Sequence, residues 1–325
     1  MKTEMILGVD GGGSKTHLAL AGRDGRLLAM EAGPGTNLEA QKPGETVAIL
    51  SGILARACRR AGVSPGGIRA SCFGMSGVDI AQDIPHAGRN ITGKLGLSGP
   101  RKVHNDAFLA LFSAGWKDRG AVVTVGTGHK WLAVNGRREA MHDGLVYPGL
   151  KDMIMEELLK AAEGYSPHSG FTSRMYRRFG FRSTGDFIRR WRYGGSRDYV
   201  KTVPASSWRR IAGVQELLGR EADSGDKLAL ELVDRYARML AEGTMVAVRR
   251  AKAAGSGLEV VMSGSVLAGI RPLQSAFRRH LRVYLPGAAA VPAVFRPIRG
   301  ALVFAAHQAW RGLPPESLLE SQLRY

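Results

Sequence analysis

Residues 5–20 read MILGVDGGGSKTHLAL, an apolar strand that runs into three glycines and out into a second, alternating strand. Consecutive glycines let the backbone approach a bulky anion and take up positive φ, so that several N–H groups can point at one phosphate. The hydroxyls of Ser14 and Thr16 add donors, and Asp10 at the strand end is placed to hold a hydrated Mg²⁺. The stretch therefore predicts a phosphate-binding turn, although glycines at a hairpin tip are also typical of plain turns.

A second stretch repeats this plan. Residues 120–136, GAVVTVGTGHKWLAVNG, read as an apolar strand, a glycine turn at 126–128, a second strand and an Asn135-Gly136 turn, about 115 residues after the first copy. Asp24-Gly25 is the late turn of the first copy. In both copies a strand follows the glycines, whereas a Walker A loop or a Rossmann fingerprint opens a helix. Two such units predict a duplicated domain whose glycine loops grip one polyphosphate.

Several further motifs, in the same order along the chain, resemble those of the BadF/BadG/BcrA/BcrD ATPase family, which includes N-acetylglucosamine kinases and belongs to the actin/hexokinase/Hsp70 superfamily. Residues 10–16 resemble the first phosphate loop of the family, and residues 126–128 resemble its second. The other matching segments are the sugar-contacting segment at 33–37, the glycine-containing strand end at 73–79, the catalytic aspartate motif Asn105-Asp106-Ala107, the adenosine loop at 262–266, and Gly300-Ala301, which begins the closing helix.

The resemblance implies an α/β fold of two duplicated actin-like ATPase (ribonuclease H-like) domains around a nucleotide cleft. We expect an N-terminal domain over residues 1–117, joined by a terminal helix at about 299–312. The second domain is expected over 118–298, with a helical, basic insertion at about 165–212. Strands that alternate with helices agree with layered α/β architecture.

The resemblance also implies ATP and Mg²⁺ as cofactors, with Asp10 as the metal ligand. The expected nucleotide-binding residues are Gly12, Gly13, Ser14, Lys15, Thr16, Gly126, Thr127, Gly128, Gly264 and Ser265. The carboxylate of Asp106 is the expected base for the acceptor hydroxyl; the alternative is a helix N-cap, a position that aspartate favours. Lys15 can meet a phosphate or stay solvated.

Acceptor contacts are expected from Thr36, Asn37, Asp106, His129 and Lys130. The alternative for Asn37 is an Asx turn, and the alternative for His129 and Lys130 is that they point away from the cleft. After the second phosphate loop, kinases of the family carry Gly-Trp-Gly and then Gly-Asp-Glu-Gly-Ser, whereas this chain has DGLVYPGLKD at 143–152. Asp152 could replace the lost acid or cap a helix. Relative to the family pattern, the nucleotide-binding loops are kept, whereas the residues expected to contact the acceptor differ.

Composition is that of a globular protein, with 44% apolar residues in 325. No apolar run reaches the roughly 18–20 residues that a membrane span needs, and no signal peptide is visible. Two cysteines, Cys58 and Cys72, are too few for a disulfide framework and predict reduced, buried thiols. We expect a cytoplasmic homodimer that acts on a small sugar.

The net charge of +18 is concentrated in residues 174–210, which hold eleven Arg or Lys and two acids, with aromatic residues between them. Such a surface can bind nucleic acid or another polyanion, or place arginines near an anionic substrate. The plainer interpretation is a helical insertion with its aromatics packed inward. It is favoured because no recognition motif is present, so nucleic acid is not expected but stays open.

The pattern of apolar residues, glycines and prolines also predicts the elements. Helices are expected at about 44–61, 80–95, 106–116, 151–163, 226–253, 270–280 and 299–311, and strands within 5–32 and at about 68–74, 101–104, 120–134 and 258–262.

Three functions follow from these features. The first is ATP-dependent phosphoryl transfer to a hydroxyl of an amino sugar or related sugar, with Asp106 as base. The second is a nucleotide-binding or regulatory relative that has lost this activity. The third is an ATPase that activates a partner protein through an iron–sulfur cluster held by cysteines between two subunits.

Overall fold

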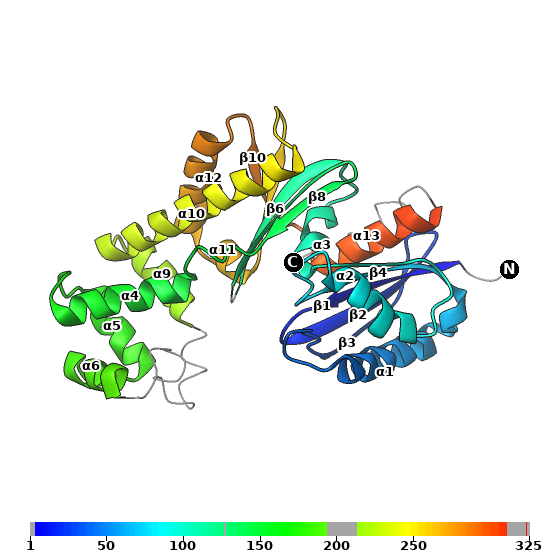
Figure 1. The fold of residues 1–325 in the computed structure, drawn as a ribbon, viewed down its shortest axis with the longest axis horizontal. Helices are drawn as coiled ribbons and strands as arrows, with labels where there is room; N and C mark the ends of the chain where they lie inside the picture. The colour runs from blue at the N-terminus through cyan, green and yellow to red at the C-terminus, as the bar shows by residue number, and fades with distance from the viewer. Residues whose placement is uncertain (1–3, 127, 194–212, 311–322, 324–325) are drawn as a thin grey trace.

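The computed structural model describes residues 4–126, 128–193, 213–310 and residue 323. Its strands form two five-stranded sheets, one in each lobe (Figure 1). The first sheet contains β1 (Met5–Gly11), β2 (Lys15–Gly22), β3 (Leu27–Pro34), β4 (Ile68–Met75) and β5 (Arg101–His104). The second contains β6 (Arg119–Val125), β7 (His129–Asn135), β8 (Arg138–His142), β9 (Glu259–Ser263) and β10 (Ala289–Pro292).

The two sheets have the same topology. The first has the order β3-β2-β1-β4-β5 and the second the order β10-β9-β6-β7-β8, which is the same arrangement listed from its other edge. In each sheet the first three strands are antiparallel neighbours, and the last two run parallel to the first strand. The late turns also correspond, because Gly25 and Gly136 both have positive φ, 79° and 59°. The expected duplication is therefore present in the fold.

Helices cover both sheets. In the first lobe they are α1 (Pro43–Ala61), α2 (Asp83–Asn90) and α3 (Asp106–Phe112), with 3₁₀ turns at Pro65–Gly67 and Thr92–Lys94. In the second they are α4 (Leu150–Glu163), α5 (Gly170–Phe179), α6 (Thr184–Tyr193), α9 (Val214–Asp223), α10 (Lys227–Ala251), α11 (Ser265–Gly269) and α12 (Arg271–Tyr284). The helices α4, α5 and α6 extend away from the second sheet (Figure 1).

The last helix, α13 (Pro297–Trp310), follows the second sheet in sequence but packs on the first (Figure 1). Two glycines permit this contact. A Cβ on Gly8 of β1 would lie 3.0 Å from the Cβ of Ala301, and one on Gly300 would lie 1.8 Å from the carbonyl oxygen of Leu109 in α3. The backbones of β1, α3 and α13 therefore approach one another more closely than larger residues would allow.

Alternation along the strands separates two faces in each lobe, because successive side chains of a strand point to opposite sides. In β1 and β2 one set, including Leu7 and Leu18, packs under α1, and the other, including Ile6 and Ala19, packs beneath α3 and α13. In β7, Trp131 packs into the helices of the second lobe, whereas Leu132 joins the cluster of α3 and α13. The cluster that contains Ile6, Ala19 and Leu132 thus includes buried residues from both lobes and joins them.

No helix in the described part of the chain is long and apolar enough to cross a membrane. Cys58 and Cys72 are free and buried, in α1 and β4, and burial raises the pKa of both thiols. The prediction of buried, reduced cysteines is confirmed.

Candidate active site

The first glycine loop joins β1 to β2 and closes with a bond from the Gly12 N–H to the Lys15 carbonyl, 3.1 Å. The loop rests on the segment that follows β3, because the Thr36 N–H donates to the Gly12 carbonyl over 3.0 Å. A Cβ on Gly35 would lie 2.2 Å from the Gly13 carbonyl oxygen, so only glycine fits there. Gly13, Ser14 and Lys15 are exposed, and the loop offers its outer backbone to a ligand.

Positive φ is not what these glycines supply. None of Gly11, Gly12 and Gly13 lies in the left-handed region, contrary to the expectation from sequence. Gly11 is instead required by a close approach, since its Cβ would lie 2.4 Å from the Thr36 hydroxyl oxygen, whereas a Cβ on Gly13 would meet nothing within 4 Å. Gly13 is therefore exposed at the tip of the loop, with open space beside it.

The hydroxyls of Thr16 and Thr36 bond to each other over 3.0 Å, and both residues are fully buried. Neither side chain faces the cleft, because Thr16 shares the face of β2 that carries Leu18 and packs beneath α1. The expectations that Thr16 contacts the nucleotide and Thr36 the sugar through their hydroxyls are corrected. These side chains hold the first loop against the segment at 33–37.

Asn37 forms the Asx turn that was the alternative interpretation, with its Oδ1 accepting from the Glu39 N–H over 3.0 Å. The turn packs against the end of β4, where the Leu38 N–H donates to the Ser76 carbonyl over 3.0 Å. Gly77 has a φ of 83°, and a Cβ there would lie 2.9 Å from the Asn37 Oδ1. The amide nitrogen of Asn37 is not needed for this turn and stays a candidate acceptor contact.

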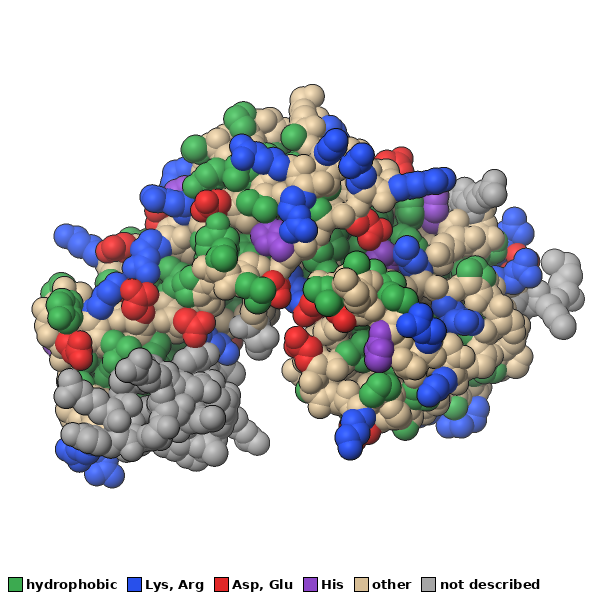
Figure 2. Space-filling view, viewed as in Figure 1, with side chains coloured by type: hydrophobic (Ala, Val, Ile, Leu, Met, Phe, Trp, Pro, Cys, Tyr) green, Lys and Arg blue, Asp and Glu red, His purple; other side chains and the backbone are tan. Residues whose placement is uncertain are grey.

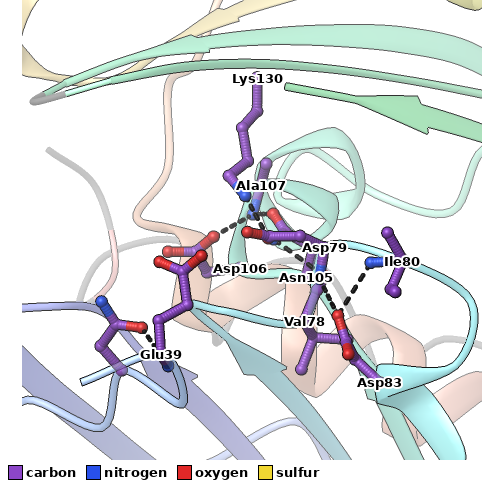
Figure 3. Close-up of polar contacts among 10 residues, drawn as sticks. Glu39, Val78, Asp79, Ile80, Asp83, Asn105, Asp106, Ala107 and Lys130 are labelled. Carbon is purple, nitrogen blue, oxygen red and sulfur yellow. Dashed lines mark hydrogen bonds and ion pairs between the residues drawn. The ribbon is translucent and has the colours of Figure 1, made fainter. Parts of the chain in front are cut away.

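Asp106 is the first residue of α3, and the N-cap is its neighbour Asn105, whose Oδ1 accepts from the Ala107 N–H over 2.9 Å. Asp106 also accepts from that N–H over 2.9 Å, and its carboxylate is half-buried beside Asp79 and Lys130 (Figure 3). The cap position that was the alternative for Asp106 is therefore filled by another side chain.

Burial raises the pKa of Asp106, Lys130 and the Ala107 N–H lower it, and Asp79 raises it again. Burial also raises the pKa of Asp10 to about 7, with Asp106 adding to the effect. The His17 Nδ1 lies 3.9 Å from Asp10, but burial, Lys15 and Arg296 lower the pKa of this imidazole, so it is neutral at pH 7. Two neighbouring carboxylates thus lack a full cationic partner, an environment that fits a divalent cation.

The second glycine loop closes with a bond from the Gly126 N–H to the Gly128 carbonyl, 2.9 Å. A Cβ on either glycine would meet nothing within 4 Å, as beside Gly13. Thr127, a predicted nucleotide contact, lies outside the described residues. Gln215 in α9 donates from its Nε2 to the Gly126 carbonyl over 3.2 Å and so supports the loop, a role that no sequence pattern indicated.

His129 and Lys130 follow this loop and point to opposite faces of β7. His129 is 7% exposed, and its Nδ1 lies 3.1 Å from the Tyr236 hydroxyl within the second lobe. The expectation that His129 contacts the acceptor is corrected, because strand alternation turns it away from the cleft. Lys130 instead reaches across the cleft and forms an ion pair with Asp79 (Figure 3).

Gly264 and Ser265 lie at the end of β9, beside the end of β6. Gly264 has a φ of 90°, and a Cβ there would lie 2.2 Å from the Val125 carbonyl oxygen. Ser265 lines a cavity of about 240 Å³ between α9 and α11 and another of about 390 Å³ beside Pro292. These cavities adjoin the second glycine loop through Gln215 and Gly264.

The segment at 143–152, which departs from the family pattern, leads into α4. Asp152 accepts from the Gly149 N–H over 2.9 Å and so occupies the N3 position of a capping box, which was the alternative to an acceptor contact. Leu145 and Val146 are strongly exposed, at 92% and 86%. The carboxylate of Asp152 therefore has a structural role at the start of α4.

The basic segment follows the plainer interpretation as far as it is described. Tyr176, Phe179, Phe181 and Phe187 are buried in the core of the second lobe. Arg174 forms an ion pair with Glu221 of α9. The remainder, residues 194–212, lies outside the described residues.

The space-filling view shows a notch between the two lobes (Figure 2), and the Lys130–Asp79 ion pair joins its walls. Asp79 and Asn105 lie within the sequence motifs but had no predicted role, because their hydrogen bonds join elements that are distant in sequence. The only sequence signal for this network is that both are polar residues that follow β4 and β5.

Residues 7–146 match the BadF/BadG/BcrA/BcrD ATPase family. The N-acetyl-D-glucosamine kinase of Dictyostelium discoideum is 28% identical over 256 residues, which cover 72% of this chain and 76% of that protein. The N-acetylmuramic acid/N-acetylglucosamine kinase of Clostridium acetobutylicum is 24% identical over 289 residues, covering 86% and 91%.

A solved structure from Chromobacterium violaceum, provisionally identified as an N-acetylglucosamine kinase, superposes with a TM-score of 0.66 at 22% identity and covers 94% of this chain and all of its own. This likeness shows the fold and confirms the two-domain actin-like architecture. The chain is thus similar to the BadF/BadG/BcrA/BcrD ATPase family over residues 7–146, and to the two kinases named above over most of its length.

Proposed function

We propose that the protein transfers the γ-phosphoryl group of ATP to a hydroxyl of an amino sugar or a related sugar. The observation that carries this proposal is the half-buried carboxylate of Asp106, which lies at the cleft, while Asn105 holds the N-cap position of α3. The kinase names of two relatives, which align with most of this chain, support it further.

The two glycine loops would hold the polyphosphate from opposite lobes. Phosphoryl transfer depends on positioning and on neutralising charge. The loops would supply backbone N–H groups from Gly13 and Ser14 on one side and from Gly128 on the other, because the N–H groups of Gly12 and Gly126 close the loops. Lys15 follows Ser14 directly, and its exposed ammonium would add a positive charge beside the polyphosphate. The adenosine would lie against Gly264 and Ser265, beside α9.

Asp10 is the proposed ligand of Mg²⁺. The fit rests on the pKa of its carboxyl, which burial and Asp106 raise to about 7 and which a cation would lower. Among the described residues, no group of three or more His, Cys, Asp or Glu could hold a metal ion alone. Asp10 would therefore share the ion with water and phosphate oxygens, as is common for Mg²⁺. When bound, the ion neutralises charge on the phosphates.

Asp106 would accept the proton of the attacking hydroxyl. Burial and Asp79 raise the pKa of its carboxyl, and the nearby ammonium of Lys130 opposes this, so that the group stays available as a base. The amide nitrogen of Asn37 is the proposed donor to another oxygen of the sugar, whereas the ammonium of Lys130 is bonded to Asp79. A homodimer and a cytoplasmic location stay predictions, and light scattering would test the first.

A nucleotide-binding relative without kinase activity is the second candidate. It is favoured by the segment at 143–152, where Asp152 caps a helix and the family's paired acids are absent. The partner-activating ATPase loses support, because Cys58 and Cys72 are buried within one lobe and cannot reach a cluster shared between subunits.

The test is ADP release from ATP with a panel of amino sugars, comparing the wild type with Asp106→Asn. A lost general base typically costs about 10²–10⁴-fold in rate, and nucleotide affinity and thermal stability should stay close to wild type because Asn105 keeps the cap. Sugar-independent ADP release in both proteins would contradict the kinase proposal. Nucleotide binding without any transfer would favour the second candidate.

A further inference from the structure

We propose that Lys130 is a positioning residue that couples the second glycine loop to the start of α3, where Asp106 lies, by way of Asp79 and Asn105. This inference rests on the proposed function, in which Asp106 is the base.

The coupling begins with Asp79, which lies just past β4 in the first lobe. Its Oδ1 accepts from both the Lys130 Nζ and the Asn105 Nδ2, the latter over 2.8 Å (Figure 3). Its backbone N–H donates to the Asp83 Oδ2 over 2.8 Å. Asp79 is therefore held from the first lobe on two sides, and Lys130 adds the single bond that comes from the second lobe.

Asn105 carries the connection to the catalytic helix. It is 2% exposed, its Nδ2 also donates to the Val78 carbonyl over 3.1 Å, and its Oδ1 caps α3 through the Ala107 N–H. The next residue is Asp106. A shift of Asp79 would move Asn105, and with it the first turn of α3, because a buried amide that loses its partners is left with unsatisfied hydrogen-bonding groups.

The other end of the connection is the phosphate loop. Lys130 lies two residues after Gly128 and pairs across the hairpin with Thr124, while the neighbouring pair, Val125 and His129, closes the loop. His129 is anchored in the core of the second lobe by Tyr236. The strand therefore moves with that lobe, and nucleotide held by the loop sets where the ammonium of Lys130 stands.

Charge gives the ion pair a second effect. Asp79 raises the pKa of Asp106, Asp106 raises that of Asp10, and Lys130 opposes the rise at Asp106. The side chains of Lys130 and Asp79 are only 23% and 20% exposed, so water screens them incompletely. Without Lys130, the three carboxylates of the first lobe would lie near one another with no ammonium from the second lobe beside them.

The kinetic test compares Lys130→Met, Lys130→Arg, Asp79→Asn and the double variant. We expect Lys130→Met to lower kcat by about 10- to 10²-fold, the scale of a slightly misplaced reacting group, with the KM values for ATP and sugar within about twofold. Lys130→Arg should recover most of kcat. The double variant should be no slower than the slower single variant, because both changes break one connection.

Lys117→Met is the matched control. Lys117 forms an ion pair with Glu259 at similar exposure, 21%, but away from the cleft residues, and its loss should leave kcat unchanged. A Lys130→Met enzyme that turns over at the wild-type rate would overturn the proposal. So would a large rise in the KM for sugar at unchanged kcat, with additive effects in the double variant, since that pattern indicates a direct acceptor contact.

Hydrogen exchange separates this proposal from the kinase assignment. A non-hydrolysable ATP analogue should slow exchange at the Asp79, Ile80 and Ala107 amides, which are bonded within this network, in the wild type and Lys130→Arg but not in Lys130→Met. Equal slowing in all three variants would overturn the coupling even if sugar is phosphorylated. The expected pattern without sugar turnover would keep the coupling and reject the kinase.

Discussion

The two β-turn-β hairpins of this protein share one backbone plan and use their strand ends differently. In the first lobe Gly11 pairs with Thr16 and Asp10 with His17; in the second, Val125 pairs with His129 and Thr124 with Lys130. In both, the residue next to the loop is buried in its own lobe. The next residue, His17 in the first lobe and Lys130 in the second, points to the opposite face of its strand.

What differs is the charge on the cleft side. The first lobe presents the carboxylates of Asp10, Asp79 and Asp106, and the second presents the ammonium of Lys130. Duplication therefore conserved the loop geometry while the chemistry diverged between the copies. In the proposed function, the first lobe would hold the metal ion and the base, and the second lobe would hold the nucleoside.

The largest effect is expected when either loop is blocked. Gly13→Val and Gly126→Val place side chains in open space, so the fold should keep its stability while nucleotide affinity falls by at least about 10²-fold, the scale of a lost anion-binding donor. Calorimetric titration with ATP measures this. Gly44→Val, also in open space but in the first turn of α1, is the control and should bind normally. Retained affinity in one loop variant would show that only the other loop holds phosphate.

Replacing Asp10 by asparagine should raise the stability of the metal-free protein at pH 8. A carboxyl whose pKa rises to about 7 on folding destabilises the folded state as pH increases from about 4 to 7. Because 19% of the side chain is exposed, we expect a gain of about 1–2 kcal/mol. Thermal melts at pH 4.5 should show no gain, and Mg²⁺ should stabilise only the wild type. A variant less stable than wild type at pH 8 would contradict this.

The threonine pair beneath the first loop should behave as a structural unit. Thr16→Val or Thr36→Val leaves one buried hydroxyl unpaired and should cost about 1–3 kcal/mol, whereas the double variant should be nearly as stable as wild type. Denaturant unfolding of the three variants tests this. If a single variant lost nucleotide affinity at unchanged stability, the hydroxyls would be ligand contacts after all.

The smallest effect is expected at His129. This residue occupies the position in the second hairpin that Thr16 occupies in the first, since Val125 pairs with His129 as Gly11 pairs with Thr16. His129→Phe removes the bond to Tyr236 and should cost about 1 kcal/mol of stability. The KM for the sugar should not change, because the imidazole points away from the cleft. A raised KM with normal stability would restore the acceptor role.

Much of the fold follows from local pattern. The helix expected at 44–61 is Pro43–Ala61 and ends at Gly62 with a φ of 67°, as a glycine C-cap does. The strand at 101–104 and the start of the helix at 106 are also confirmed. The strands β8 and β10 were missed: Ala289–Pro292 is short, rich in alanine and contains a proline, so it lacks the signals of a strand. The helix α9 was also not predicted, although it forms one wall of the cavity beside Ser265.

The sequence by itself determined the two glycine loops, the duplicated plan and the presence of an aspartate at the start of α3, because these depend on residues close together in the chain. Tertiary structure decided which groups face the cleft. His129 and Lys130 are neighbours, and only the packing of β7 shows which one is buried. Lys130 and Asp79 are 51 residues apart, and only the meeting of two sheets brings their charges together. Side-chain alternation is local, but the side of a strand that is covered is set by every other element that packs against it.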